Sequence, residues 1–212
     1  MTDLQQARVN TVDLADIEDG RNRRRAANRD KIVTAFLTLV REGNPTPSAQ
    51  AVAEHADVSP RTVFRCFQDM ETLYREISVL LREEFLPRAT LNLNTPDRRE
   101  RLSRLVTNRA KLFEDMRPFR QAAEAQSHLS TTLATDKAFV TAIEKERLRQ
   151  AVNPDGKMDK TLMDALTAAT SFNYWLRLRA EQGLSPEEAA KAMSFAAFAI
   201  FDAGGDAGPI AL

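Results

Sequence analysis

The sequence predicts an all-α protein built from two helical parts. The chain of 212 residues is rich in Ala, Leu, Arg and Glu and contains only 7 glycines, a composition that favours helix. Apolar residues recur three and four positions apart along most of it, as they do on one face of a helix. Capping residues divide this pattern into an N-terminal group of helices, a connecting helix and a C-terminal group.

Composition narrows the class of protein further. The 30 basic and 30 acidic side chains balance, so the chain as a whole is not a polycation that coats nucleic acid. A single cysteine permits no internal disulfide, which fits a reduced compartment. The N-terminus lacks the apolar core of a signal peptide, and no apolar run is long enough to cross a bilayer. We therefore expect a cytoplasmic protein with no membrane partner.

The first 27 residues differ from the rest in charge. Acidic residues dominate up to Gly20, and four arginines follow between Arg21 and Arg25. An acidic, weakly apolar opening before a basic run is typical of disordered segments. We expect a disordered arm over residues 1–27, which serves either as a solubilising tail or as a basic arm for an anionic partner.

The first predicted helix covers about residues 28–42. Ile32, Phe36 and Val40 lie four positions apart and form an apolar stripe. Gly43 ends this helix, and a loop with two prolines follows. We expect the stripe to pack over the next two helices and to fix their positions.

Residues 48–67 predict two short helices joined by a tight turn. Ser48 is a good N-cap for the first of them. Residues 57–59 form the turn, Ser59 caps the second helix, and Pro60 occupies its first position, where a missing N–H costs nothing. Two capped helices with a short turn are typical of helix-turn-helix units, whose second helix enters the major groove of DNA.

The second of these helices has two unlike faces. At about 100° per residue, Val63, Cys66 and Phe67 fall on the inner side. The outer side is basic and polar, and arginine binds guanine or phosphate through two N–H groups. The outer residues predict DNA contacts through Arg61, Thr62 and Arg65, with Phe64 at the flank. The alternative is a short amphipathic helix with a solvated basic face.

Further DNA contacts are expected around this unit. Hydroxyl groups in the loop and at the helix caps lie where such folds bring the backbone close to phosphate, although they also fit ordinary loop positions. Basic arms beside a helix-turn-helix follow or enter the minor groove. The expected contacts are Thr46, Ser48 and Ser59 near the helix starts and Arg23, Arg24 and Arg25 in the arm.

A longer helix follows over about residues 70–86. Asp69 is a suitable N-cap, and Pro87 closes the helix. Leu73, Ile77 and Phe85 mark its buried side. Residues 28–86 thus form the expected DNA-binding domain with its connecting helix.

This N-terminal part resembles the TetR family of bacterial transcriptional regulators. The similarity covers about residues 29–81. Its matching residues are Val58, Ser59, Thr62, Val63, Phe64, Phe67, Glu71 and Leu73. The resemblance implies a homodimer that binds a palindromic DNA operator, a small-molecule effector in the C-terminal domain and, in most relatives, repression of transcription.

Three positions depart from the family pattern. Asp57 stands where glycine is common, and Asp tolerates the left-handed backbone of the turn. Phe64 replaces a tyrosine whose hydroxyl can hold a phosphate, and Met70 replaces a lysine. Because both of these changes remove phosphate contacts, we do not expect Phe64 or Met70 to add ionic affinity. Arg65 and the basic arm are available to compensate.

Residues 95–203 predict a C-terminal domain of five helices. The helices are expected at about residues 95–116, over a short span from Pro118, and at 135–152, 160–182 and 185–202. Thr95 is the expected first cap, Gly183 a C-cap, and Ser185 with Glu188 a capping box. Residues 204–212 are expected to be a loose tail.

The last two of these helices are apolar around most of their circumference. Such helices need two partners, which are here their own core and the same pair from a second chain. The expected dimer contacts are Trp175, Leu178, Phe195, Phe198, Ala199 and Phe201. The alternative is a fully buried helix pair in a monomer.

An effector site is indicated by aromatic residues with a few polar groups, which suit a small apolar or amphipathic ligand. The expected lining is Phe113, Met116, Phe119, His128, Phe139, Asn173, Tyr174 and Trp175. Aromatic residues at helical spacing also fit an ordinary core, and His128 also fits a surface position.

No catalytic or metal-binding pattern accompanies these features. His55, Cys66 and His128 lack the spacing of metal ligands, and the sequence contains neither a phosphate-binding glycine loop nor a nucleophile motif. We expect no cofactor besides the effector, and a DNA-binding regulator rather than an enzyme. The rival prediction is a helical ligand-binding or interaction protein with a weakened DNA-binding unit, which the zero net charge, Phe64 and Met70 favour.

Overall fold

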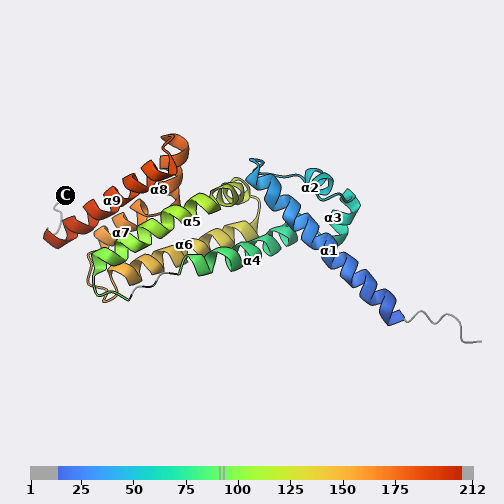
Figure 1. Ribbon diagram of the computed structural model, residues 1–212, viewed down its shortest axis with the longest axis horizontal. Helices are drawn as coiled ribbons and strands as arrows, with labels where there is room; N and C mark the ends of the chain where they lie inside the picture. Colours follow the sequence, from blue (N-terminus) through green and yellow to red (C-terminus); the bar gives the residue numbers. More distant parts are fainter. Residues whose placement is uncertain (1–13, 91, 93, 207–212) are drawn as a thin grey trace, which may run out of the picture. The chain divides into compact units, whose positions relative to one another are not determined.

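The computed structural model describes residues 14–90, 92 and 94–206, and every regular element in these ranges is helical (Figure 1). This confirms the predicted all-α class. The chain divides into two compact units, Met1–Glu76 and Ile77–Leu212. In the described ranges, no helix has both the length and the apolar character needed to span a membrane.

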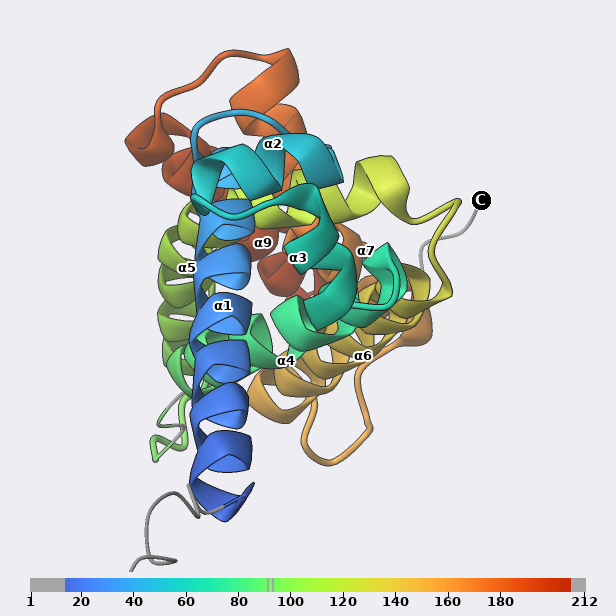
Figure 2. The same ribbon diagram turned by 90° about the vertical axis from the view of Figure 1, so that its right-hand side faces the viewer.

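The first unit contains α1 (Leu14–Arg41), α2 (Ala49–His55), α3 (Pro60–Cys66) and the start of α4 (Met70–Arg88). The second half of α1 lies against α2 and α3 (Figure 2). The apolar stripe expected on α1 is buried, as are the inner faces of α2 and α3. This core contains Ile32, Val33, Phe36, Val40, Val52, Ala53, Val63, Cys66, Phe67 and Leu73.

Helix α1 is longer than expected, and this overturns the predicted disordered arm over residues 14–27. The helix begins at Leu14, and residues 1–13 of the predicted arm lie outside the described ranges. The physical reason lies in the composition of the segment. Arg and Ala are strong helix formers, and acidic residues at the start of a helix interact favourably with its dipole. The high local charge that indicated disorder therefore also suits one continuous helix.

The turn between α2 and α3 has the predicted chemistry. The Ser48 hydroxyl accepts from the backbone N–H of Ala51, and the Ser59 hydroxyl accepts from that of Thr62, both at 3.2 Å. Asp57 adopts the left-handed backbone conformation, with φ of 53°. These caps fix the starts of α2 and α3, and the Asp side chain is tolerated in the turn between them, as expected.

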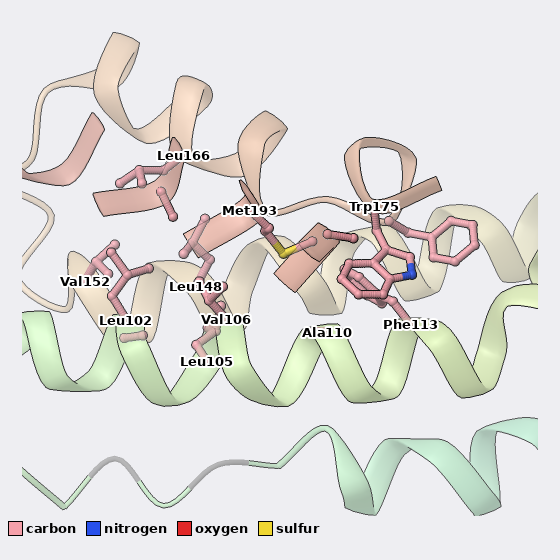
Figure 3. Packing of buried hydrophobic residues seen from close by; sticks show 14 of the residues in the cluster. Leu102, Leu105, Val106, Ala110, Phe113, Leu148, Val152, Leu166, Trp175 and Met193 are labelled. Atoms are coloured by element: carbon pink, nitrogen blue, oxygen red, sulfur yellow. The ribbon is translucent and has the colours of Figure 1, made fainter. Parts of the chain in front are cut away.

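The second unit is a helical bundle. It contains the remainder of α4 together with α5 (Arg98–Gln126), α6 (Thr131–Val152), α7 (Lys160–Ala169), α8 (Phe172–Leu176), the π-helical turn η1 (Arg177–Glu181) and α9 (Pro186–Asp206). Its core is apolar, and in Figure 3 Trp175 points from its helix toward α5. The labelled core residues are Leu102, Leu105, Val106, Ala110, Phe113, Leu148, Val152, Leu166, Trp175 and Met193.

One expected break and two expected helix starts before residue 152 are wrong. Helix α5 runs through Pro118, so the two helices expected on either side of it are one. A proline interrupts one hydrogen bond of a helix, and the packing of the buried Phe113 and Phe119 on both sides of it keeps the helix continuous. The N-cap of α5 is Asp97 rather than Thr95, and Ser130 starts α6 four residues earlier than expected.

The last expected helices are also divided differently. The helix expected over residues 160–182 ends at Ala169, and Ser171 caps a new helix by accepting from the N–H of Tyr174. The capping box of α9 is confirmed, since Ser185 and Glu188 each donate a backbone N–H to the other's side chain. Helix α9 continues to Asp206, which shortens the predicted tail to residues 207–212, outside the described ranges.

Candidate nucleic-acid interface

Helix α3 presents a basic and aromatic face outside the core of the first unit. Val63 and Cys66 are buried on its inner side. On the other side, Arg61 and Arg65 are exposed, and the Phe64 side chain is 56% exposed. The sequence-based division of α3 into an inner and an outer face is therefore confirmed.

The hydroxyl groups expected to contact phosphate lie at the helix starts. Ser59 Oγ and Thr62 Oγ1 are 2.9 Å apart, so one hydroxyl donates to the other and the hydrogen of the second remains for an external acceptor. Ser48 Oγ uses a lone pair for capping, which leaves its O–H as a donor. The Thr46 side chain is exposed in the preceding loop.

Arg29 fixes the end of α3. Its Nη1 donates to the carbonyl oxygen of Cys66 at 2.5 Å, its Nη2 pairs with Glu76 of α4, and its guanidinium lies 4.4 Å from the centroid of the Phe67 ring. Sequence analysis gave Arg29 no role, because a single arginine in a basic run carries no signal of its partners. Its contacts join α1, the end of α3 and the start of α4 within the first unit.

A hollow of about 480 Å³ lies between α1 and α3. We call it the arginine hollow. Its lining consists of arginines and asparagines, with no acidic side chain among those that the structure describes. The lining residues are Arg21, Asn22, Arg24, Arg25, Asn28 and Arg65. Four arginines on one concave surface make it a candidate site for an anion.

The hollow brings together only part of the predicted basic set. Arg24, Arg25 and Arg65 line it, whereas Arg23 does not. Arg21 and Asn28 were not predicted as site residues. Positions 21, 24, 25 and 28 follow the i, i+3, i+4, i+7 spacing of one helix face, so this signal was present in the sequence. It was hidden because the segment was assigned to a disordered arm.

The structure does not gather the residues predicted for an effector site. Phe113 and Trp175 are each only 1% exposed and belong to the core of the second unit. His128 and Asn173 are exposed, and the Phe139 side chain is 42% exposed. Of the others, Phe119 is buried beside Phe85, with ring centroids 6.3 Å apart, and Met116 and Tyr174 are half-buried. The structure therefore shows no common lining for these residues, because helical spacing could not separate core aromatics from surface ones, and the effector site stays a prediction.

The predicted dimer residues also divide into two groups. Trp175 and Leu178 are buried in the subunit's own core, so their assignment to a dimer face is wrong. Phe198 lies under the guanidinium of Arg99, 4.6 Å from ring centroid to Cζ, and Phe201 packs partly against the core. Only Phe195, 78% exposed, and Ala199 are presented on the outside of α9.

Two polar groups of the second unit, one buried and one partly buried, escaped sequence analysis. Arg109 is 6% exposed and donates to the carbonyl oxygen of Thr170 at 2.8 Å and to its hydroxyl at 2.6 Å. Burial lowers the pKa of Arg109 to about 10. Glu114 accepts two bonds of 2.9 Å from Arg179 and one of 3.2 Å from Trp175 Nε1. Arg179, as the largest cause, lowers the pKa of Glu114. Arg109 satisfies the cap residue Thr170 of α7 and Glu114 joins α5 to two side chains that follow α7, so both groups are structural.

In the described ranges, no group of three or more His, Cys, Asp or Glu side chains is arranged to hold a metal ion. Comparison with protein-family models, with curated proteins and with solved structures gave no significant match to this chain. The geometry of the first unit is therefore the main guide to function.

Proposed function

We propose that this protein is a sequence-specific DNA-binding transcriptional regulator in which α2 and α3 form a helix-turn-helix unit. The observation that carries the proposal is the outer face of α3. Arg61, Phe64 and Arg65 project from a helix whose other face is buried. Arginine offers paired donors to guanine or phosphate, and an exposed phenylalanine can contact the methyl group of thymine.

The rigidity of α3 supports the same function. Base recognition requires side chains that a fixed backbone holds in register with the groove. Serine hydroxyls cap α2 and α3, and Arg29 bonds to the last carbonyl of α3. A short helix that is held at both ends suits insertion into a groove better than a solvated amphipathic helix does.

Homodimerisation and effector control complete the proposal. Two copies would present two α3 helices to the half-sites of a near-palindromic operator. The outside of α9, with Phe195 and Ala199, is the proposed contact between copies. An effector that binds one arrangement of the dimer more tightly would shift the population toward binding or release of DNA. Repression is the proposed outcome of DNA binding.

The rival function is a helical ligand-binding or interaction protein whose DNA-binding unit has weakened. Phe64 favours it, because an exposed phenyl ring cannot donate a hydrogen bond to phosphate. The arginine hollow beside α3 favours DNA binding, because four arginines line it and place positive charge on the same surface.

In vitro selection with the full-length chain tests the proposal. The probe is a library of random duplexes of roughly 30 base pairs, which is enough for two half-sites one helical turn apart. We expect enrichment of one near-palindromic sequence, whose binding weakens steeply as salt rises. The double variant Arg61→Ala/Phe64→Ala should lose the enrichment, while Lys31→Ala, which removes a charge from α1 outside the hollow, should keep it. Failure of the wild-type chain to enrich any sequence would refute the function.

A further inference from the structure

We propose that the arginine hollow is a clamp for a backbone phosphate of DNA, and that Arg65 acts in this clamp rather than in base recognition. The inference rests on the proposed DNA-binding function and specifies which contact is made at one part of the same surface. It also corrects the role expected for Arg65 from its place on the outer face of α3.

The chemistry of the lining selects a phosphate. Guanidinium groups donate two parallel N–H bonds to phosphate oxygens, and the amides of Asn22 and Asn28 can add further donors. Among the side chains that the structure describes, no carboxylate lines the hollow, so a metal cation or an amine finds no counter-charge there. Four arginines close to one space carry like charges, and a bound anion would reduce the repulsion between them.

Arg61 and Arg65 lie in opposite end turns of α3, and this difference indicates different contacts with DNA. The first residues of a recognition helix approach base edges, while its later residues lie nearer the flanking backbone. Arg61 is in the first turn of α3, whereas Arg65 is in the last turn and lines the hollow with three arginines of α1. The two arginines therefore have different surroundings although they are four positions apart on one face.

The size of the hollow suits a stretch of backbone. The hollow is partly open to solvent, and its volume of about 480 Å³ does not enclose a single small ion. An open hollow of this kind leaves room for a phosphodiester whose chain continues beyond it. A free phosphate or a nucleotide has the same anionic chemistry, but the presence of Arg65 on α3 places the bound phosphate beside the helix proposed to enter the groove. We therefore assign the hollow to DNA.

The test measures salt-dependent binding of the full-length chain to a duplex of arbitrary sequence. This probe needs no operator, since phosphate contacts alone govern non-specific affinity. The variants are Arg25→Ala, Arg65→Ala and the double variant. Lys31→Ala, alone and combined with Arg65→Ala, is the charge-matched control on α1. Circular dichroism and thermal melting establish that each variant is folded.

We expect each hollow variant to weaken binding and to lower the slope of log K against log salt by up to about 1. Because Arg25 and Arg65 would hold the same phosphate, the double variant should lose less affinity than the product of the two single losses. For Lys31→Ala combined with Arg65→Ala, the loss of DNA affinity should equal the product of the two single losses.

Three results would overturn the clamp. The first is an unchanged salt slope in Arg65→Ala with altered preference at one base pair, which would make Arg65 a base-contacting residue. The second is independent, multiplying losses for Arg25 and Arg65. The third is tighter binding of inorganic phosphate or a nucleoside triphosphate than of duplex by calorimetry, which would make the hollow a small-anion site. A chain that selects no operator but shows the coupled salt response would refute sequence specificity and retain the clamp.

Discussion

Arg29 of α1 donates from Nη1 to the carbonyl oxygen of Cys66, 2.5 Å away, and Cys66 is the last residue of α3. A helix leaves its final carbonyl groups without intrahelical partners, so this bond satisfies one of them. Because the same guanidinium pairs with Glu76 and covers the ring of Phe67, a single side chain fixes the end of the proposed recognition helix.

We expect Arg29→Ala to lower the free energy of unfolding by about 1–3 kcal/mol, since it leaves a partly buried carbonyl and a carboxylate without their donor. It should also weaken binding to all DNA sequences alike, because α3 loses its fixed position. Chemical denaturation and duplex titration measure the two effects. Arg29→Lys retains the charge opposite Glu76 but lacks the planar fork, so its loss should be intermediate. Wild-type stability in Arg29→Ala would contradict the role assigned to this contact.

The turn residue Asp57 allows a test of backbone strain. Its φ of 53° lies in the left-handed region, which glycine enters freely and β-branched residues avoid. We expect Asp57→Val to destabilise the chain by about 1–2 kcal/mol, and Asp57→Gly to be neutral or slightly stabilising. Thermal unfolding of both variants, with Asp57→Asn as the conservative control, measures the difference. Equal melting temperatures for the Val and Gly variants would show that the turn relaxes.

Local signals predicted the helix caps of the first unit correctly. The caps Ser48, Ser59 and Asp69 act within three residues of themselves, so the sequence alone could place them. Pro118 shows the limit of such signals. A proline predicts a helix boundary, but packing on both sides of it outweighs one lost hydrogen bond. The local sequence around Pro118 gives no information on this packing between helices, so it could not predict that the helix continues.

The candidate sites were harder to predict for a related reason. A helix that is apolar around its circumference needs partners, but the sequence does not say whether they belong to the same chain. Trp175 therefore fitted core, ligand site and dimer face equally well, and burial assigns it to the core. The arginine hollow depends on a contact between segments about forty residues apart, which the spacing within either segment cannot reveal.

Glu114 makes the stability of the second unit depend on pH. Arg179, through its hydrogen bonds, holds the pKa of this carboxyl below its ordinary value of 4.5. A carboxyl with a lowered folded pKa contributes stability that is fully present above the ordinary value and is lost as pH falls toward the folded one. We therefore expect the free energy of unfolding to decrease below about pH 4.5. In Glu114→Gln, the share of this decrease that comes from Glu114 should be absent.

The single tryptophan reports this transition, because Trp175 Nε1 donates to the same carboxylate. At neutral pH, Glu114→Gln should cost about 1 kcal/mol, a value reduced by partial solvent screening of the pair. Glu124→Gln is the control, since Glu124 pairs with Lys137 on the exposed surface of the second unit. If the two variants have the same acid unfolding curve followed by fluorescence, the assignment to Glu114 is wrong.

The exposed part of α9 allows a test of the proposed homodimer. Phe195 is 78% exposed, and a carboxylate at this position would be costly in an apolar interface. We expect Phe195→Asp to weaken dimerisation at least roughly tenfold, which is about 1.4 kcal/mol, in sedimentation equilibrium. Leu129→Asp is the matched control, because Leu129 is 74% exposed and lies outside α9. A wild-type chain that is monomeric at micromolar concentration would exclude this interface.

Arg61 is the arginine that remains for base recognition if Arg65 holds a phosphate. It is exposed in the first turn of α3, where recognition helices approach base edges, and it does not line the arginine hollow. We expect Arg61→Ala to cost about 1–3 kcal/mol on the selected operator and to relax the preference at one base pair of each half-site, with the salt slope nearly unchanged.

Repeated selection and titration against operators with single base-pair changes measure the effect of Arg61. Arg61→Lys separates geometry from charge, since it keeps the positive charge but loses the two parallel donors that guanine accepts. Its specificity should therefore resemble that of Arg61→Ala more than that of the wild type. Equal weakening on every sequence, together with a lower salt slope, would place Arg61 on the backbone and leave Phe64 as the remaining base contact on the outer face of α3.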